Sequence, residues 1–342
     1  MLGIRVPANR PPQEVIDVVR HADSVGFDAA WLPDSQLNYR EIWTTLGALA
    51  VSTERIQIGP SVTNVVSRHP TVTASAARTL HELAPDRVIL GLGSGDSTVG
   101  FDRLLPAKPD ELKRGALAIR SLLHGEPVSY GKFHATLRDA SANIPIYMAG
   151  SGPKVLAAAG EVADGVIILP GRVKEKMALV RDAAARANRH PPPVFLYVMA
   201  EVTDDIEALS RNVKPIALRD AQLEGTGPYD ERGLAISVPE HVAGADGDVG
   251  HAEDYAAASR QLDEFVSDEA ALWFAQNRML VGSKTAIKAR VDHWRSLGIA
   301  GVIVSQISGS ELPWRLVDSL GFLTEQRVGC PNPRLPQEMI AE

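Results

Sequence analysis

The stretch Arg87-Val-Ile-Leu-Gly-Leu-Gly-Ser-Gly-Asp96-Ser97 has the pattern of a buried strand that ends in a glycine-rich turn with a carboxylate beside hydroxyls. Gly91, Gly93 and Gly95 carry no Cβ, so the backbone amides of this turn can approach an anion or a flat ring closely. A second glycine-rich turn follows the next predicted strand, in Ile146-Tyr-Met-Ala-Gly150-Ser-Gly152-Pro-Lys154. Pro153 suits the first turn of a helix, and two such turns in one chain indicate a shared ligand.

Apolar runs typical of buried strands alternate with amphipathic helical patterns on both sides of this stretch. The predicted strands are Leu2–Val6, Ala29–Leu32, Ile56–Pro60, Arg87–Leu92, Ile146–Ala149, Gly165–Leu169, Val194–Glu201 and Gly301–Ser305. The predicted helices cover 14–25, 40–51, 71–83, 110–123, 155–162, 174–188 and 285–297, a last one follows Pro313, and a small hairpin is expected over 128–137.

These strands are rich in Val and Ile and do not alternate with polar residues, as in parallel sheets covered on both faces. Eight strands, each followed by a helix, predict an α/β fold of the (β/α)8 TIM-barrel class, with an open doubly wound sheet as the alternative. A dinucleotide-binding turn is disfavoured, because the third glycine comes one position early for Gly-x-Gly-x-x-Gly and the turn lies in the fourth unit.

The segment after the seventh strand is much longer than an ordinary connection between a strand and a helix. We expect one barrel domain over residues 1–342 with a helical insertion at 202–281, placed as a lid or a dimer contact. Helices are predicted there at Asp204–Arg219, His251–Phe265 and Ala270–Gln276.

Composition excludes several classes of function. The net charge of −7 and the pI near 5.8 argue against a nucleic-acid partner, which would require a basic surface. The single cysteine, Cys330, and the lack of a run of roughly 20 apolar residues predict a cytoplasmic protein without a membrane partner. The histidines lack the spacing of metal ligands and no Ser-centred nucleophile turn occurs, so no metal site and no acyl transfer are expected.

In barrels of this kind, the active site is formed by the loops that follow the carboxyl ends of the strands. Candidate residues therefore lie at 33–36, 61–64, 94–97, 150–152 and 170–172, all rich in glycine or in hydrogen-bonding side chains. Each also has a purely structural interpretation: Asp34 and Asp96 as turn or capping residues, and Arg172 as a solvated charge at a helix entry.

Several of these motifs occur together, and in order, in one known group of enzymes. They are Ile58-Gly-Pro-Ser-Val-Thr-Asn64, Arg68-His-Pro-Thr-Val-Thr-Ala-Ser-Ala76, Leu90-Gly-Leu-Gly-Ser-Gly-Asp96, Pro145-Ile-Tyr-Met-Ala-Gly-Ser-Gly-Pro-Lys154 and Ala163-Asp-Gly-Val-Ile-Ile168. With them, the chain resembles the luciferase-like flavin/deazaflavin superfamily over nearly its whole length. Within it, the chain is most similar to the coenzyme F420-dependent branch, which contains methylenetetrahydromethanopterin reductase and F420-dependent glucose-6-phosphate dehydrogenase.

This resemblance implies a set of cofactor-binding residues. It implies a cis peptide bond at Ser61–Val62 that supports the deazaflavin ring, with Asp34 and Asn64 near the ring and Ser94 and Asp96 beside it. It further implies contacts to the ring and to the ribityl-phosphate chain from Ala149, Gly150, Ser151 and Gly152, continued by Gly171 and Arg172.

One position departs from the pattern of this branch. Its members often carry a histidine directly after the aspartate that Asp34 matches, whereas this chain has Ser35. The proton donor or acceptor would then be Asp96, or Gln36 through a water molecule, with Asp34 close to the reactive ring. A carboxyl group buried against an apolar ring can have its pKa raised enough to donate a proton.

The resemblance implies an F420-dependent oxidoreductase that transfers a hydride between deazaflavin C5 and a small organic substrate. An FMN-dependent luciferase-like monooxygenase is the first alternative, and a non-catalytic flavin- or deazaflavin-binding protein is the second. A homodimer is expected from the family.

Overall fold

The computed structural model of the chain describes residues 1–95, 99, 104–239, 254–307 and 311–324. Its central sheet is parallel throughout and has the strand order β3-β2-β1-β12-β10-β9-β8-β5-β4. The bounds of these strands are β1 Leu2–Arg5, β2 Ala29–Leu32, β3 Gln57–Pro60, β4 Thr63–Asn64, β5 Leu90–Gly93, β8 Ile146–Ala149, β9 Gly165–Ile168, β10 Val194–Val202 and β12 Gly301–Ser305.

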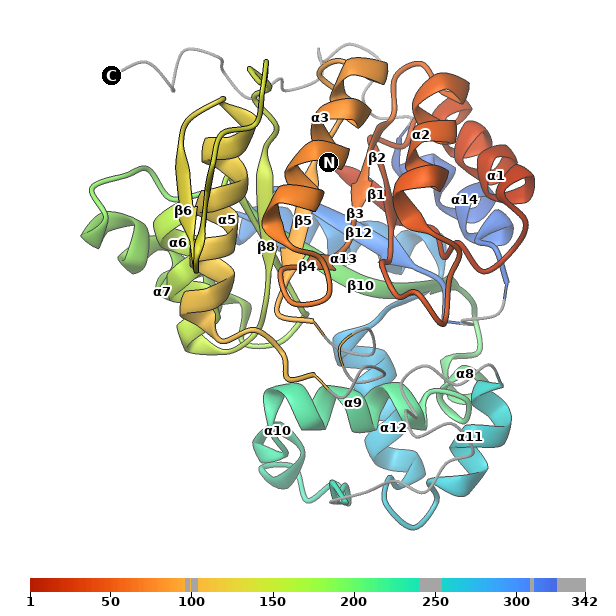
Figure 1. The fold of residues 1–342 in the computed structure, drawn as a ribbon. Helices are drawn as coiled ribbons and strands as arrows, with labels where there is room; N and C mark the ends of the chain where they lie inside the picture. Colours follow the sequence, from red (N-terminus) through yellow and green to blue (C-terminus); the bar gives the residue numbers. More distant parts are fainter. Residues whose placement is uncertain (96–98, 100–103, 240–253, 308–310, 325–342) are drawn as a thin grey trace.

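The two ends of this sheet meet, so that it forms a barrel (Figure 1). A parallel bridge joins Ile58 to Val88: Ile58 N donates to Arg87 O at 2.7 Å, and Ile89 N donates to Ile58 O at 3.1 Å. The short strand β4 continues β3 beyond residues 61–62 and pairs with β5. Counting β3 and β4 as one, the described residues form eight barrel strands, which confirms the predicted (β/α)8 class.

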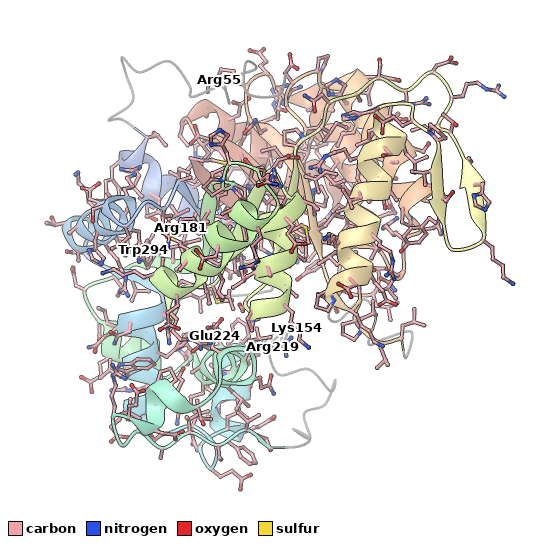
Figure 2. All side chains as sticks on the ribbon, turned by 90° about the vertical axis from the view of Figure 1, so that its left-hand side faces the viewer. Arg55, Lys154, Arg181, Arg219, Glu224 and Trp294 are labelled. Atoms are coloured by element: carbon pink, nitrogen blue, oxygen red, sulfur yellow. The ribbon has the colours of Figure 1, made fainter. Side chains whose placement is uncertain are left out.

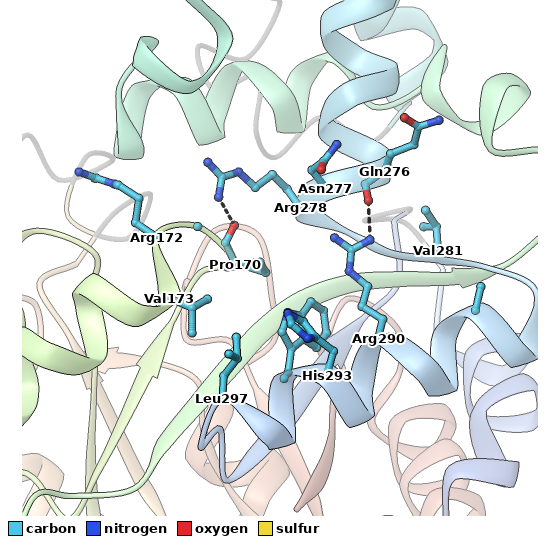
Figure 3. A pocket seen from close by; sticks show the side chains of 13 residues that line it. Pro170, Arg172, Val173, Gln276, Asn277, Arg278, Val281, Arg290, His293 and Leu297 are labelled. Atoms are coloured by element: carbon cyan, nitrogen blue, oxygen red, sulfur yellow. Dashed lines mark hydrogen bonds between the residues drawn. The ribbon is translucent and has the colours of Figure 1, made fainter. Parts of the chain in front are cut away.

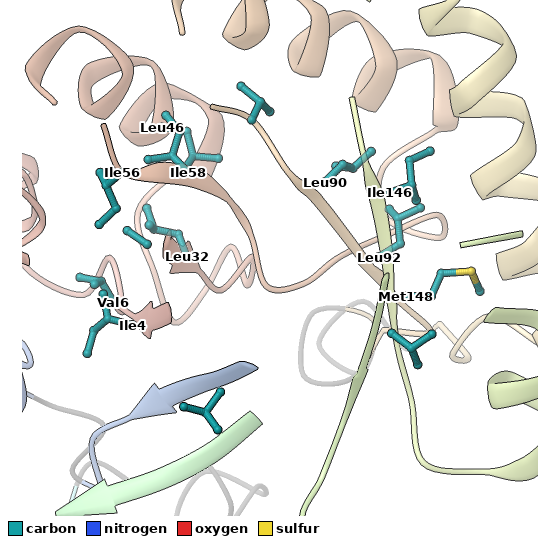
Figure 4. Packing of buried hydrophobic residues seen from close by; sticks show 14 of the residues in the cluster. Ile4, Val6, Leu32, Leu46, Ile56, Ile58, Leu90, Leu92, Ile146 and Met148 are labelled. Carbon is teal, nitrogen blue, oxygen red and sulfur yellow. The ribbon is translucent and has the colours of Figure 1, made fainter. Parts of the chain in front are cut away.

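Helices surround the barrel, as predicted from the spacing of their apolar residues. In α1, Val15, Val18, Val19 and Ala22 are buried along one face. Together with the outward side chains of the strands, such faces form the main core between helices and barrel (Figure 4). The outer helices are α1 Pro12–Ser24, α2 Ile42–Ser52, α3 Pro70–Leu83, α5 Pro109–Leu123, α6 Pro153–Val162, α7 Val173–Arg186, α13 Lys284–Ser296 and α14 Trp314–Leu320, the last followed by the 3₁₀ turn Gly321–Leu323.

A second, smaller cluster fills the lumen of the barrel. The ring centroids of Trp31 on β2 and Tyr147 on β8 lie 5.8 Å apart, and Tyr147 stacks on Phe195 of β10 at 5.0 Å. None of these strands are neighbours in the sheet, so the rings meet across the lumen. Side chains therefore fill the barrel at the level of these rings. A ligand has access only nearer the carboxyl ends of the strands.

The segment between β10 and α13 carries further helices and its own apolar cluster (Figure 1). Its described elements are α8 Ile206–Ser210, α9 Lys214–Glu224, α10 Gly227–Asp230, α11 Tyr255–Gln261, α12 Asp268–Arg278 and β11 Leu280–Gly282, which pairs with β10. The predicted continuous helix over Asp204–Arg219 is wrong: α8 ends at Ser210 and α9 begins at Lys214, because Pro215 suits the first turn of a helix and not its interior. That residues 202–281 form one insertion remains a prediction.

The hairpin predicted over 128–137 is confirmed as the antiparallel strands β6 Val128–Tyr130 and β7 Phe133–Ala135. No helix in the described part of the chain combines the length and the apolar character that crossing a membrane requires.

Candidate functional site

The residues predicted to form the site follow five barrel strands at the same end of the barrel. Asp34 and Gln36 follow β2, Ser61, Val62 and Asn64 follow or extend β3, and Ser94 follows β5. The turn after β8 carries Gly150, Ser151 and Gly152, directly after Ala149 at the strand end, and the turn after β9 carries Gly171 and Arg172. Asp96, which was also predicted, lies outside the described residues.

The peptide bond between Ser61 and Val62 is cis, which confirms that prediction. The side chain of Val62 lies over the glycines of β5. A Cβ on Gly93 would come within 2.5 Å of Val62 Cγ2, and a Cβ on Gly91 within 2.2 Å of the carbonyl oxygen of Pro60. The missing side chains of Gly91 and Gly93 therefore make room for Pro60 at the end of β3 and for Val62 after it, a contact that the glycine pattern alone does not indicate.

Asp34 is almost completely buried and forms a two-point ion pair with Arg68. Arg68 Nε donates to Oδ2 at 2.7 Å and Nη2 donates to Oδ1 at 3.0 Å, while Thr63 Oγ1 donates to Oδ2 at 2.7 Å. Arg68 also reaches Glu41 Oε1 at 2.9 Å. This arrangement fixes the start of β4 against the loop after β2, so Asp34 is held as an anionic anchor.

Asn64 is engaged in its own loop. Its Oδ1 accepts from the backbone amides of Val66 at 2.9 Å and Ser67 at 2.8 Å, and its Nδ2 donates to Ser67 Oγ at 3.0 Å. This side chain shapes the turn that leads to α3. His69 then caps α3 and meets the ring of Tyr130 edge-on, with centroids 5.6 Å apart.

The turn after β8 presents an open helix start. Gly152 is the N-cap residue of α6, no side chain caps this helix, and Pro153 occupies its first turn. A Cβ on Gly152 would have no atom within 4 Å. Unpaired amides at the start of a helix, together with its dipole, bind anions well.

Gly171 and Arg172 line a cavity of about 540 Å³ between the start of α7, the end of α12 and α13 (Figure 3). Its thirteen lining residues include Arg278, Arg290 and His293 and none of them is an aspartate or a glutamate. Arg278 Nη1 donates to the carbonyl oxygen of Pro170 at 2.8 Å. Burial and repulsion from Arg278 lower the pKa of Arg290, as expected where cations crowd.

Behind this cavity, a buried charge network joins α7 to α9. Lys176 Nζ donates to Glu224 Oε1 at 2.6 Å, and their side chains are only 3% and 1% exposed. Figure 2 shows Glu224 where α9 meets the barrel. Nearby, Tyr229 donates to Asp220 at 3.0 Å, and burial raises the pKa of Asp220 to about 6 although Arg278 opposes this shift. Burial likewise lowers the pKa of Lys176.

The remaining predicted residues are placed as follows. Gln36 is exposed, whereas Ser61, Val62, Ser94, Ala149, Gly150 and Ser151 are partly buried. Sequence reasoning missed the role of Arg68, because its partner Asp34 lies 34 residues away in the chain. Among the described residues, no group of three or more His, Cys, Asp or Glu side chains could hold a metal ion.

Comparison with known proteins places this geometry in a family. The profile of the luciferase-like monooxygenase family matches residues 2–301. A curated 5,10-methylenetetrahydromethanopterin reductase of Methanolobus tindarius is 35% identical over 217 residues, which are 60% of this chain and 66% of that enzyme. The matches to the first three such reductases thus span 54% to 66% of their lengths.

An F420-dependent glucose-6-phosphate dehydrogenase of Beutenbergia cavernae is 32% identical over 273 residues, covering 70% of this chain and 80% of that enzyme. The solved structure of the coenzyme F420-dependent tetrahydromethanopterin reductase of Methanopyrus kandleri superposes with a TM-score of 0.73 at 23% identity, covering 94% of this chain and 96% of that one. The fold, the profile match and these relatives agree: the chain belongs to the luciferase-like monooxygenase family.

Proposed function

We propose that this protein is an F420-dependent oxidoreductase that transfers a hydride between deazaflavin C5 and a small organic substrate. The observation that carries the proposal is the 32% identity, over 70% of this chain, to an enzyme that is named as F420-dependent. The end of the barrel that carries the predicted site residues, here called the rim, adds independent support. The turn after β8 leads into an uncapped helix, and the turn after the neighbouring strand β9 lines a cationic cavity. Both features suit a cofactor with an anionic tail.

The residues present fit such a cofactor. The open start of α6 at Gly152 would hold a phosphate group, and Gly171 with Arg172 would extend the anion site into the cavity of Figure 3. When bound, the deazaflavin supplies the hydride chemistry. The protein contributes position, a dry surface and one group that holds or moves a proton.

Asp96, Gln36 and Asp34 are the proposed catalytic residues. Both carboxylate oxygens of Asp34 accept from Arg68, so we propose that Asp34 orients the loop near the ring. Asp96, or Gln36 through a water molecule, would then hold the proton.

Changing Asp96 to asparagine should suppress turnover and leave cofactor affinity unchanged, since the amide keeps the shape of the side chain and loses the acid.

Binding of F420 and of FMN to the purified protein tests the cofactor assignment directly. F420 should bind with at least tenfold higher affinity, and reduced F420 should be oxidised by an organic acceptor without consumption of oxygen. Tighter binding of FMN with oxygen consumption would instead support a monooxygenase. Tight F420 binding without oxidation by any acceptor would support a binding protein without catalysis.

The variant Gly152→Val tests the phosphate position. A Cβ here meets no described protein atom within 4 Å, and φ is −74°, which a side chain tolerates. The valine side chain would, however, fill the space in front of the amides of α6. We expect the Kd for F420, measured by fluorescence titration, to rise at least tenfold with an unchanged Tm.

Gly227→Val is the matched control, since a Cβ there also has no neighbour within 4 Å and Gly227, on α10, does not line the cavity of Figure 3. An unchanged Kd in Gly152→Val would place the phosphate elsewhere.

We also propose a homodimer in the cytoplasm, formed through the outer faces of α2 and α3. A groove between these helices is lined by residues including Trp43, Gly47 and Val72, and the side chains of Val72 and Val51 are 53% and 70% exposed. Exposed apolar side chains that cluster on one surface favour association.

The variant Val72→Glu should convert the dimer into a monomer, because it places a charge in the centre of the proposed contact. Light scattering coupled to size exclusion measures the mass. Leu179→Glu on α7 is the control, since Leu179 is 38% exposed on a different face. A wild-type protein with the mass of one chain would contradict the dimer.

A further inference from the structure

Arg5 lies inside the mouth of the barrel. Side chains along a strand alternate between the two faces of the sheet. On β1, Leu2 and Ile4 belong to the outer core, whereas Gly3 faces the lumen, where a Cβ would come within 2.8 Å of Trp31 Nε1. Arg5 therefore faces the lumen too, one layer nearer the rim, and it is the last residue of its strand. In the sequence, this position is marked by a charged residue at the end of an otherwise apolar strand.

The described side chains found around Arg5 are tyrosines. Its guanidinium carbon lies 5.9 Å from the ring centroid of Tyr39 and 6.0 Å from that of Tyr197. Burial tends to lower the pKa of Arg5, but the hydroxyl groups of Tyr197, Tyr39 and Tyr255 raise it above the ordinary value. Arg5 is therefore a cation at every physiological pH. Among the described acidic residues, none forms an ion pair with it.

Four other cations of the described chain are neutralised by a carboxylate from the protein, whereas Arg290 donates to the carbonyl oxygen of Gln276. Arg68 pairs with Asp34, Lys176 with Glu224, Lys214 with Asp263 and Asp268, and Arg278 with Asp220. Burying an unpaired charge costs several kcal/mol, and a cation–π contact returns only about 0.5–2 kcal/mol. Arg5 thus differs from these four: it contacts Tyr39 and Tyr197, but no carboxylate of the described residues neutralises its charge at the place where a substrate would bind.

The position of β1 in the barrel separates Arg5 from the proposed cofactor turn. Going round the sheet, β8 is the fourth strand from β1 in either direction, through β2, β3 and β5 or through β12, β10 and β9. The loop of β8, which would hold the cofactor, therefore lies opposite Arg5. A substrate over the exposed face of the ring would lie between them.

We propose, on the basis of the proposed function, that Arg5 binds a carboxylate group of the substrate and so selects organic acids as its substrate class. The planar guanidinium matches a carboxylate in a two-point contact, and Tyr197 and Tyr39 add hydroxyl groups that can donate hydrogen bonds. One cation suits a group with one negative charge better than a phosphate dianion. The hydride then goes to or from a carbon atom of an anion held at a fixed distance from the ring.

The test uses the full chain without cofactor. The probes are small, so that the shape of the substrate pocket does not decide whether they bind. Formate, acetate and benzoate are compared with formamide, acetamide and benzamide by calorimetry and by thermal shift. We expect the wild-type protein to bind the carboxylates at least tenfold more tightly than the amides. Arg5→Gln should abolish this preference, Arg5→Lys should retain part of it, and the exposed control Arg20→Gln should keep all of it.

Two further measurements separate the proposal from other roles of Arg5. The Tm of Arg5→Gln without ligand should equal or exceed that of the wild type, because the variant removes an uncompensated charge; a lower Tm would show a structural role and overturn the proposal. The Kd for F420 should change less than threefold in Arg5→Gln. A loss of F420 affinity with an unchanged carboxylate preference would assign the anion to the cofactor and also overturn it.

An equal preference for carboxylates in the wild type and in Arg5→Gln, or no preference in either, would likewise contradict the proposal. If the wild type binds carboxylates through Arg5 but does not bind F420, the proposed function fails and the anion site stands.

Discussion

The variant Gly59→Ala is expected to prevent the barrel from closing. A Cβ on Gly59 would lie 1.7 Å from the carbonyl oxygen of Ile89 and 2.9 Å from its carbonyl carbon. These are backbone atoms beside the hydrogen bonds that join Ile58 to Arg87 and Ile89, so no side-chain rotation relieves the clash. We expect a loss of more than about 4 kcal/mol in the free energy of unfolding, or failure to fold.

Urea denaturation followed by circular dichroism measures this loss. Gly321→Ala is the matched control: a Cβ on Gly321 has no atom within 4 Å, and its backbone is right-handed helical, with φ −52° and ψ −32°. This control should be neutral or slightly stabilising. If Gly59→Ala unfolds at the urea concentration of the wild type, the contact between β3 and β5 is not the constraint that the structure indicates.

Lys176→Met is expected to destabilise the protein by about 3–5 kcal/mol, because it removes the buried partner of Glu224 and leaves the carboxylate only the half-exposed Arg172, whose Nη2 lies 3.5 Å from Oε2. Lys176 Nζ reaches Glu224 Oε1 at 2.6 Å and the carbonyl oxygen of Leu169 at 3.1 Å. The double variant Lys176→Met/Glu224→Leu should recover most of this loss, because it removes both charges and keeps the volume. Urea denaturation of the wild type, both single variants and the double variant gives the coupling energy.

Lys288→Met provides a control with the same geometry at the surface. Lys288 Nζ lies 2.6 Å from Asp292 Oδ2, but these side chains are 40% and 43% exposed. Solvent screens such a pair, so the expected loss is much smaller than that of Lys176→Met. Equal losses in Lys176→Met and Lys288→Met would contradict the claim that burial makes the contact between α7 and α9 strong.

Much of the fold could be predicted from residue patterns. The strand Leu90–Gly93 and its neighbours are apolar throughout because helices cover the barrel outside and side chains fill it inside. Prediction of the segment after β10 was poorer. Helices α8 and α9 occupy the region expected as one helix, and the strand β11 was not expected, because it is only three residues long and depends on pairing with β10.

The candidate site was predictable at the level of loops and less so at the level of single atoms. The rule that ligands bind beyond the carboxyl ends of parallel strands selected loops that do share one rim. The observed contacts of Asp34 and Asn64 differ from the tasks that the sequence suggested, and only those of Asn64 are local in the chain. Asp34 lies against Arg68, and Asn64 holds the turn that follows it.

Residue patterns are sufficient to predict the barrel, because the periodicity of apolar residues is local and each βα unit repeats the same pattern. They also predict which loops meet at the rim, because parallel strands place their carboxyl ends together. Which charges are neutralised depends on the folded chain: Lys176 contacts Glu224 48 residues away, whereas Arg5 lies among tyrosines from separate segments. The cost of burying a charge depends on neighbours brought together by folding, and no local pattern encodes them.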